Sequence, residues 1–251
     1  MKVISWNILA DEFIAPKYYP NIPKKLFDRK ERFLTIVRKI IQEDADVYLL
    51  QEVMKKEYLN LKKLFKNYMF SDLVRVDWKY PNEYNKKSES GNIIILKKDK
   101  FREMKHIDNF VCIVSAIYKT KSNKLKEVCF ASVHLDDLSQ LTRYRQIENI
   151  INMTNMYKRC IVAGDFNQNY KKSSSLYILL KDNGFNSSQN KPNELTFFIS
   201  KSQLIDNIFY RGFKIEKTNI LNVCGKKSIE NIECQLKEYG SDHFPVMTLL
   251  N

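Results

Sequence analysis

Seven residues that can bind a metal ion or transfer a proton adjoin apolar runs typical of β-strands. A polar side chain at the end of such a run lies at the rim of a sheet, so side chains from several strands can meet there. Carboxylate oxygens suit a hard cation such as Mg²⁺, which also takes phosphate oxygens of a substrate as ligands. The pattern therefore predicts one metal-dependent phosphodiesterase site. These residues are Asn7 in VISWNIL, Glu52 in VYLLQEV, His134 in FASVHL, Asp165 and Asn167 in IVAGDFN, and Asp242 and His243 in GSDHFPV.

Glu52 is the predicted metal ligand. It follows an apolar strand-like run, where a carboxylate is costly to desolvate unless a cation or a hydrogen-bond donor satisfies it. A salt-bridged glutamate at a strand end is the competing explanation. Asn7, taken by itself, is equally compatible with a satisfied amide in the core, so neither residue decides the question alone.

The segment GDFN at 164–167 carries a stronger signal. Gly164 lets the backbone turn sharply after the strand, and side chains two residues apart in an extended turn point to the same side. Asp165 can then activate a water molecule while the amide of Asn167 binds a phosphate oxygen. An Asx turn, in which the aspartate bonds the local backbone, is the alternative.

The neighbours Asp242 and His243 face opposite ways in an extended segment, so one can serve a metal while the other faces the phosphate. A protonated histidine gives a charge-assisted hydrogen bond to a phosphoryl group, and a carboxylate must orient its ring. Asp206 in QLIDNIFY is the predicted partner. His134 offers a second imidazole donor, with a core histidine as the alternative, and His106 is assigned no role.

Length and charge favour one catalytic domain with a polyanionic partner. The 251 residues can bury a sizeable core and contain no linker or repeat, so we expect a single domain over 1–251. Lys and Arg number 42 against 29 Asp and Glu, a net charge of +13 that favours nucleic acid. The alternative is a positive charge spread evenly over solvated faces.

The cysteines and the apolar runs indicate a soluble intracellular protein. The five cysteines show no CxxC spacing and lie mostly in apolar stretches, which predicts reduced, structural thiols. The chain opens on KVISW without a signal-peptide pattern, and no run approaches the roughly 18 apolar residues of a membrane span. We expect a monomer without a membrane partner, cytoplasmic in the first instance and otherwise nuclear.

Hydrophobic periodicity predicts helices and strands in alternation. Helices are predicted over 28–43, 55–66, 140–157 and 173–183, the last one ended by Gly184. Hairpin-connected strands mixed with βα units predict an α/β fold with mixed sheets covered by helices. The predicted strands cover 3–9, 46–50, 92–96, 110–119, 128–134, 160–163, 203–210, 213–222 and 246–250, with a hairpin turn around 121–124.

Six short motifs in this order resemble the motif series of the endonuclease/exonuclease/phosphatase superfamily, over nearly the whole chain. They are SWNIL, LQEV, VHL, GDFN, LIDNIFY and SDHFPV. The resemblance implies a four-layered α/β sandwich, with two mixed β-sheets flanked by helices and Mg²⁺ or Mn²⁺ bound at the sheet rims. By motif match it assigns Glu52, Asn7 and Asp242 to the metal, Asp165 to the attacking water, Asn167 and His134 to the scissile phosphate, and Asp206 to the orientation of His243.

The N-terminal part resembles the branch that contains deadenylases, nocturnin, angel and 2′-phosphodiesterases. The segment LAD at 9–11, then Tyr19, then the basic pair Arg29 and Lys30 supply that pattern, although Gly240 stands where the family commonly has Pro. We therefore expect a nuclease of RNA 3′ ends. The C-terminal half is nearly as similar to tyrosyl-DNA phosphodiesterases, so a DNA-repair phosphodiesterase or abasic-site endonuclease is the alternative, and a catalytically idle nucleic-acid-binding module is the third.

Contacts with the nucleic acid are expected from basic and aromatic side chains. Arg29 and Arg143 are candidates for the phosphate backbone, and Tyr19 or Trp78 for stacking on a base. Each of these residues also has an ordinary explanation as a surface or packing residue.

Overall fold

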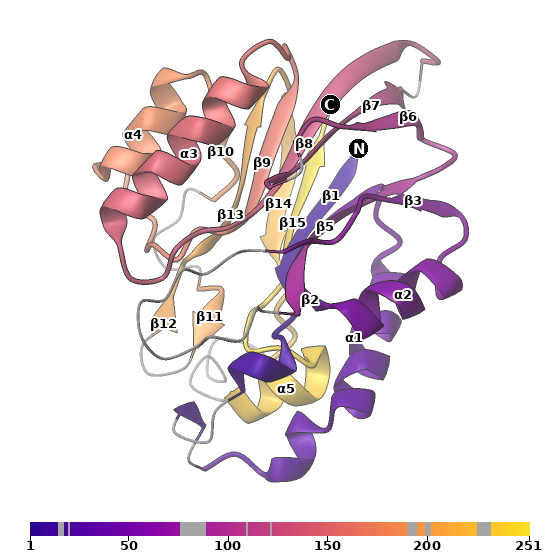
Figure 1. Ribbon diagram of the computed structural model, residues 1–251, viewed down its shortest axis with the longest axis vertical. Coiled ribbons are helices and arrows are strands. Elements are labelled where there is room, and N and C mark those ends of the chain that lie inside the picture. Colours follow the sequence, from indigo (N-terminus) through magenta and orange to yellow (C-terminus); the bar gives the residue numbers. More distant parts are fainter. Residues whose placement is uncertain are drawn as a thin grey trace.

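Two β-sheets face each other at the centre of the computed structural model (Figure 1). The structure describes residues 1–14, 18–19, 21–75, 89–108, 110–120, 122–189, 195–198, 202–224 and 232–251. The first sheet consists of β1 (Lys2–Asn7), β2 (Val47–Met54), β3 (Tyr68–Phe70), β4 (Val74–Arg75), β5 (Ser90–Lys97), β14 (Ile215–Ile220) and β15 (Val246–Leu250). The second consists of β6 (Phe101–His106), β7 (Cys112–Lys119), β8 (Leu125–His134), β9 (Cys160–Asp165), β10 (Asn186–Ser187) and β13 (Asp206–Arg211).

Both sheets are mixed, as the alternation of elements predicts. The seven-stranded sheet has the order β14-β15-β1-β2-β5-β3, with β4 paired to β5, and the six-stranded sheet has the order β10-β13-β9-β8-β7-β6. In the first sheet β1 runs parallel to β2 and antiparallel to β15. In the second β8 runs parallel to β9 and antiparallel to β7. A short hairpin of β11 (Phe197–Phe198) and β12 (Ser202–Gln203) lies apart from both sheets.

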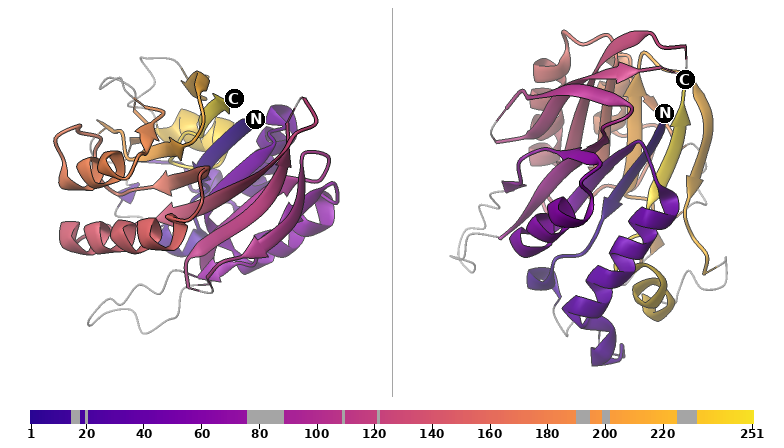
Figure 2. Two further views of the ribbon diagram at one scale, coloured as in Figure 1. Left: turned by 90° about the horizontal axis from the view of Figure 1, so that it is seen from above. Right: turned by 90° about the vertical axis from the view of Figure 1, so that its right-hand side faces the viewer.

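Helices cover the two outer faces, so the chain forms four layers (Figures 1 and 2). The seven-stranded sheet packs against α1 (Arg29–Glu43), α2 (Lys55–Leu64) and α5 (Ile232–Tyr239), and the six-stranded sheet against α3 (Gln140–Thr154) and α4 (Ser175–Asp182). Strand residues alternate between layers because successive side chains point to opposite faces. The four-layered α/β sandwich is confirmed.

The alternation is clear in β2. Tyr48 and Leu50 pack against the helices, whereas Val47 and Leu49 enter the apolar layer between the two sheets. Every residue of this strand is buried. A strand buried on both faces needs apolar residues at nearly all positions. The first four residues of β2, VYLL, are therefore apolar, and its polar residues Gln51 and Glu52 come near the rim of the sheet.

Helix α1 shows how the sequence places its own boundaries. Asp28 is the N-cap, and its side chain accepts a hydrogen bond from the backbone N–H of Glu31, 3.0 Å away. Ile36 and Ile40 lie one turn apart and pack against the first sheet. The helix ends at Glu43, and the following residue, Asp44, adopts the left-handed conformation with φ of 41°.

The predicted helices and most predicted strands are confirmed, with boundary shifts of a few residues. The predicted strand 203–210 is wrong as a single element, because it divides into β12 and β13. Helix α5 and strand β6 were not predicted, since both carry many charged residues, and strands β3, β4, β10 and β11 were not predicted, since each has only two or three residues. Of the predicted features, Trp78 and residue 121 of the expected hairpin turn lie outside the described residues.

The prediction of five reduced cysteines is wrong for two of them. Cys224, which follows β14, forms a disulfide with Cys234 in helix α5. Cys112, Cys129 and Cys160 are buried free thiols. The bonded pair lies ten positions apart in sequence without a recognisable spacing motif, so the pattern of cysteines alone did not indicate it. Among the described residues, no helix combines the length and apolar character needed to cross a membrane.

Gly164 lets strand β9 approach β8 next to the predicted site. Its φ is 152°, and a Cβ atom added there would lie 1.8 Å from the carbonyl oxygen of Val133 on β8. No side chain fits that space unless the two strands separate. The strand pairing therefore requires glycine at this position.

We predict that Gly164→Ala destabilises the protein by about 3 kcal/mol or more, because the methyl group forces β8 and β9 apart. Urea unfolding followed by circular dichroism measures the change. Gly184→Asn is the control, because Gly184 follows α4 with φ of 79°, a conformation that Asn tolerates, and only the flexible Arg211 side chain approaches it. Equal stability losses for both variants would contradict this account.

Candidate active site

The strand register brings three predicted residues to one end of the six-stranded sheet. His134 is the last residue of β8, Asp165 the last of β9, and Asp206 the first of β13. His134 pairs with Asp165 across the parallel strands, and Asp165 pairs with Asp206 across the antiparallel strands. Because the three residues are direct neighbours in the ladder, their side chains share one rim.

Asn7 and Glu52 bring the first sheet to the same rim. Asn7 ends β1, and its Nδ2 donates to Glu52 Oε1 at 2.7 Å and to Asp165 Oδ2 at 3.2 Å. The orientation of this amide follows from its other atom, because Asn7 Oδ1 accepts the backbone N–H of Leu9 at 3.0 Å. Asn7 therefore connects carboxylates that belong to different sheets.

Glu52 was expected at the end of a strand, but it lies inside β2. The pairing of β2 with β5 shifts between Leu50 and Val53, and Glu52 takes a left-handed φ of 57° at this irregularity. A bulge of this kind redirects a side chain from its regular face. The Glu52 carboxylate is held by Asn7 and by the backbone N–H of Ala10, 2.8 Å from Oε2.

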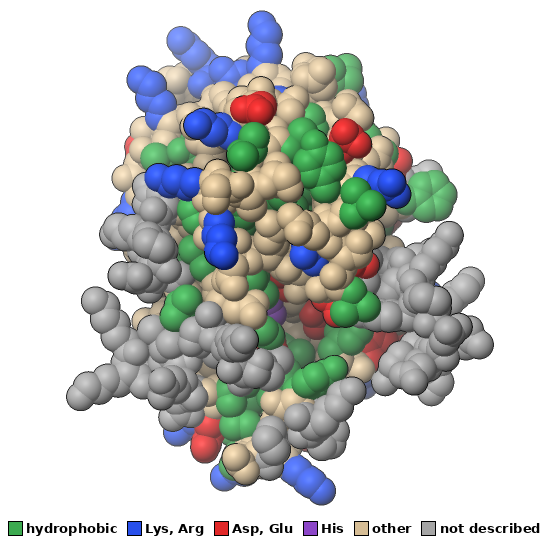
Figure 3. All heavy atoms as spheres, turned by 90° about the vertical axis from the view of Figure 1, so that its left-hand side faces the viewer, with side chains coloured by type: hydrophobic (Ala, Val, Ile, Leu, Met, Phe, Trp, Pro, Cys, Tyr) green, Lys and Arg blue, Asp and Glu red, His purple; other side chains and the backbone are tan. Residues whose placement is uncertain are grey.

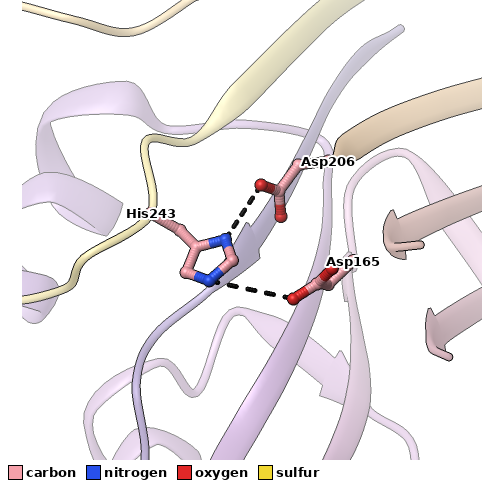
Figure 4. A group of neighbouring side chains, drawn as sticks. All are labelled: Asp165, Asp206 and His243. Atoms are coloured by element: carbon pink, nitrogen blue, oxygen red, sulfur yellow. Dashed lines mark hydrogen bonds and ion pairs between the residues drawn. The ribbon is translucent and has the colours of Figure 1, made fainter. Parts of the chain in front are cut away.

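His243 and Asp206 form a hydrogen-bonded pair (Figure 4). The distance from His243 Nδ1 to Asp206 Oδ2 is 2.9 Å, and His243 Nε2 lies 3.8 Å from Asp165 Oδ2. Burial lowers the pKa of His243, but the attraction and hydrogen bond of Asp206 and the charges of Asp242 and Asp165 outweigh it and raise that pKa to about 10. At neutral pH His243 is a protonated ring oriented by a carboxylate.

His134 differs from His243 in protonation. Burial lowers its pKa, against the attraction of Glu52, so the ring is neutral at physiological pH. Its Nε2 lies 3.8 Å from Glu52 Oε1 and 3.7 Å from Asp165 Oδ2. A neutral imidazole at this place can donate one hydrogen bond without adding charge.

Asp165 has the properties of a proton acceptor near neutral pH. Burial and the neighbouring Asp206 raise its pKa to about 7, against the attraction of His243. A carboxyl with this pKa suits general base catalysis at physiological pH. Its Oδ1 accepts the backbone N–H of Asn167 at 2.8 Å, so the Asx turn is present as well.

Asn167 lies beside Asp165 but points partly elsewhere. Its φ of 47° is left-handed, and its Nδ2 donates to the carbonyl oxygen of Leu135 at 2.8 Å. One hydrogen of the amide is thus engaged by the protein. Contact between the amide of Asn167 and a phosphate oxygen stays a prediction.

Asp242 enters the site from the loop before β15. Its side chain is 2% exposed, its Oδ2 accepts the hydroxyl of Tyr19 at 2.9 Å, and its Oδ1 is buried without a hydrogen-bond partner. The expectation that Asp242 and His243 face opposite ways holds only in part, because Asp242 Oδ1 lies 4.0 Å from His243 Nε2.

Arg32 joins the two loops that carry the metal-ligand candidates, a role that the sequence did not indicate. This buried side chain of α1 donates from Nε to the carbonyl oxygen of Gly240 at 2.8 Å, and from Nη2 to the carbonyl oxygens of Ile8 and Leu9. Its Nη1 also pairs with Asp11 at 3.0 Å. In the sequence Arg32 is one basic residue among several in DRKER, so no pattern singled it out.

The residues expected to touch nucleic acid have other contacts. Tyr19 is 4% exposed, so its ring has no face open for a base in this structure. Arg29 is an ion-pair partner of Asp11 and Glu57 at 3.1 and 3.4 Å. Arg143 is half-buried and donates to the carbonyl oxygen of Asp136 at 2.8 Å. Phosphate contacts by the two arginines stay predictions.

The charges of the site fit a divalent cation. Glu52, Asp165, Asp206 and Asp242 are all at most 8% exposed, and His243 is the protonated imidazole among them. Burial raises the pKa of Glu52, and the Asp242 charge raises it further. Carboxylate and carboxamide oxygens are the donors that Mg²⁺ and Mn²⁺ prefer. Figure 3 shows acidic side chains and a histidine inside a hollow on this face.

Two groups of residues are candidates for the ligands. Asp165, Asp206 and His243 have ligand atoms within 4.8 Å of one another. A protonated histidine cannot ligate a metal, however, and Asp206 Oδ2 already bonds the ring. Oδ1 of Asp206 and Oδ1 of Asp242 are both buried without a hydrogen-bond partner, but Asp206 is engaged in orienting His243, so Glu52 and Asp242 are the better candidates.

This fold and this arrangement of carboxylates and histidines define a class of protein. A sequence profile of the Endonuclease/Exonuclease/phosphatase family matches residues 4–243, and the chain belongs to that family. Its members are hydrolases of phosphoester bonds, including nucleases and phosphatases, and they generally use a divalent metal.

Individual relatives share less than a quarter of their residues with this chain. The chain is 23% identical over 222 residues to Protein angel of Drosophila melanogaster, covering 80% of this chain and 61% of that protein. The human Nocturnin catalytic domain, solved with a bound sulfate anion, is 17% identical at a TM-score of 0.69, covering 100% and 93%. D. rerio TDP2, solved with single-strand DNA product, is 16% identical at a TM-score of 0.67, covering 100% and 98%.

We predict that Mn²⁺ raises the melting temperature of the wild-type protein by about 5–10 °C at saturation, because the cation compensates the buried carboxylates. Glu52→Gln should lose most of this increase. Glu57→Gln is the matched control, since Glu57 is a glutamate of similar burial on α2 that pairs with Arg29 instead. The assignment of Glu52 fails if both variants respond to Mn²⁺ as the wild type does.

We also predict that His243 of the metal-free protein titrates near pH 10 and that Asp206→Asn lowers its pKa, because burial then acts without its counter-charge. The folded-state pKa of His243 lies above its ordinary value of about 6.5. The pairing therefore contributes its full stabilisation below about pH 6.5, and this stabilisation is lost as the pH rises through about 10. Imidazole NMR signals of His243, recorded over pH in the wild type and the variant, measure this. An unchanged His243 titration in Asp206→Asn would contradict the pairing.

Proposed function

We infer that the chain is a divalent-metal-dependent phosphodiesterase that hydrolyses nucleic acid. Its proposed substrate is the 3′ end of RNA, which it would shorten as a deadenylase does. The observation that carries this proposal is the meeting of a protonated His243, held by Asp206, with Asp165 and Glu52 in one buried cluster. The groups needed to activate water and to stabilise phosphoryl charge thus lie together.

In the proposed mechanism, Asp165 orients the attacking water and accepts its proton, for which a pKa of about 7 is suited. His243 donates a charge-assisted hydrogen bond to a phosphoryl oxygen, and its orientation depends on Asp206. His134 supplies a neutral donor on the side of Glu52. Glu52 and Asp242, with Asn7 beside them, would hold the divalent cation, which supplies Lewis-acid stabilisation of phosphoryl charge when bound.

The preference for RNA rests on the N-terminal half of the chain. The segment from Leu9 to Asp11, with Tyr19 and Arg29, matches the pattern of the deadenylase branch, and angel is a relative in sequence. A net charge of +13 supports a polyanionic substrate without distinguishing RNA from DNA. The chain spans 61% of the length of angel, so activities that need the rest of that protein are not carried over.

A DNA-repair phosphodiesterase is the second candidate. The observation that favours it is the likeness in fold to TDP2 solved with a single-strand DNA product, together with the resemblance of the segments KTKSNKLKEVCFASVHLDD and IDNIFYRG to tyrosyl-DNA phosphodiesterases. A catalytically idle binding module is the third candidate, and the complete set of polar residues at the site speaks against it.

We predict that labelled poly(A) RNA is shortened from its 3′ end in Mg²⁺ or Mn²⁺ and stays intact in EDTA. Mixed-sequence RNA, 2′,5′-linked oligoadenylate, abasic duplex DNA and 5′-tyrosyl DNA complete the substrate panel. Asp165→Asn and His243→Gln should each lower the rate by roughly 100-fold to 1,000-fold or more, because each removes a preorganised group.

His106→Gln is the control, since it removes an exposed imidazole far along the second sheet on β6. Incision of the DNA substrates alone would favour the second candidate. Equal cleavage with and without EDTA would contradict the proposed metal dependence, and no cleavage of any substrate would favour the idle module.

A further inference from the structure

Tyr19 contacts the site through its hydroxyl and not through its ring face. The Oη atom donates to Asp242 Oδ2 at 2.9 Å, and both side chains are buried, at 4% and 2% exposure. This contact joins residues that lie 223 positions apart in the sequence. A stacking platform would need an open ring face, so the structure gives Tyr19 a different role from the expected one.

The backbone around Asp242 is fixed by hydrogen bonds that do not involve Tyr19. Ser241 Oγ donates to the carbonyl oxygen of Asn7 at 2.7 Å, and the indole of Trp6 donates to the carbonyl oxygen of His243 at 3.0 Å. Strand β1 therefore holds this loop on both sides of Asp242. The position of the loop does not depend on the Tyr19 hydroxyl.

The Asp242 carboxylate, in contrast, is oriented by Tyr19. Among the described residues, Tyr19 supplies the hydrogen bond to this side chain, and it uses Oδ2. The other oxygen, Oδ1, is buried without a hydrogen-bond partner and lies 4.0 Å from His243 Nε2. A buried carboxylate oxygen without a partner is costly, and a cation would satisfy it.

The ring of Tyr19 is itself held in place. It packs against Phe27 with ring centroids 4.9 Å apart and planes inclined by 52°, and Phe27 belongs to the 3-10 turn Lys24–Phe27 before α1. The exposed ring of Tyr18 packs edge-on against the ring of Tyr19, with ring centroids 6.5 Å apart. The hydroxyl thus projects from a supported ring, as a group must if it is to fix another side chain.

We propose that Tyr19 is a positioning residue for the metal site, because its hydroxyl occupies Oδ2 of Asp242 and leaves Oδ1 to bind the divalent cation. This inference rests on the proposed metal-dependent site but not on the identity of the substrate. Hydrogen bonds to ligating carboxylates orient the ligand, and their loss typically weakens metal binding by roughly 10-fold to 100-fold.

The test is Mn²⁺ binding to the whole chain, measured by titration calorimetry, for the wild type, Tyr19→Phe, Asp242→Asn and the double variant. Tyr19→Phe keeps the ring and removes the hydroxyl, and it should raise the Mn²⁺ dissociation constant by roughly 10-fold or more. If Tyr19 acts through Asp242, the double variant binds no more weakly than Asp242→Asn alone.

Tyr48→Phe is the matched control, because it removes a buried tyrosine hydroxyl that bonds the carbonyl oxygen of Ile40, away from the site. It should lower the melting temperature but leave Mn²⁺ affinity unchanged. Unchanged Mn²⁺ affinity in Tyr19→Phe, an equal loss in Tyr48→Phe, or no Mn²⁺ binding by the wild type would each overturn the proposal. Tyr19-dependent Mn²⁺ binding in a chain that cleaves no nucleic acid would support it and contradict the proposed function instead.

Discussion

The compensation of buried negative charge is the constraint on which this structure depends. Glu52, Asp165, Asp206 and Asp242 converge at one rim, and each is nearly inaccessible to water. His243 compensates part of this charge through Asp206. The nearby Arg32 contributes less, because its guanidinium is engaged by carbonyl oxygens and by Asp11. Uncompensated carboxylates raise their own pKa or bind a cation, and the polar groups around these carboxylates favour the cation.

The two sheets hold this charge in place because each supplies only part of the site. Asn7 and Glu52 come from the first sheet, whereas His134, Asp165 and Asp206 come from the second. The apolar layer between the sheets fixes their relative position, and Asn7 connects them by hydrogen bonds at the rim. Left-handed backbone at Glu52 and Asn167 is a cost of such an arrangement, and residues of this kind often gather at functional sites.

Apolar periodicity predicted most elements and mixed sheets covered by helices, because it reports burial directly, whereas the four layers were implied by the resemblance to the family. The sequence also predicted that the polar residues of the site share one rim, since most of them lie at the ends of apolar strand-like runs. It did not predict Glu52 inside a strand, because a bulge depends on pairing between strands and leaves no local pattern. The contacts of Arg32 and of the Tyr19 hydroxyl were not predicted for a related reason. Their partners, Gly240 and Asp242, lie more than 200 positions away in the sequence. The Cys224–Cys234 disulfide was missed for another reason: its cysteines lie only ten positions apart, but their spacing matches no recognisable motif.

The location of the cation tests the central claim most directly. A crystal structure of the protein soaked with Mn²⁺, with anomalous scattering recorded, would locate the ion without any assumption about substrate. We expect an anomalous peak at ligand distance from Glu52 and from Oδ1 of Asp242, with the Asp206–His243 hydrogen bond intact. A peak bound by Asp165, Asp206 and His243 alone, or no peak near these carboxylates, would contradict the account.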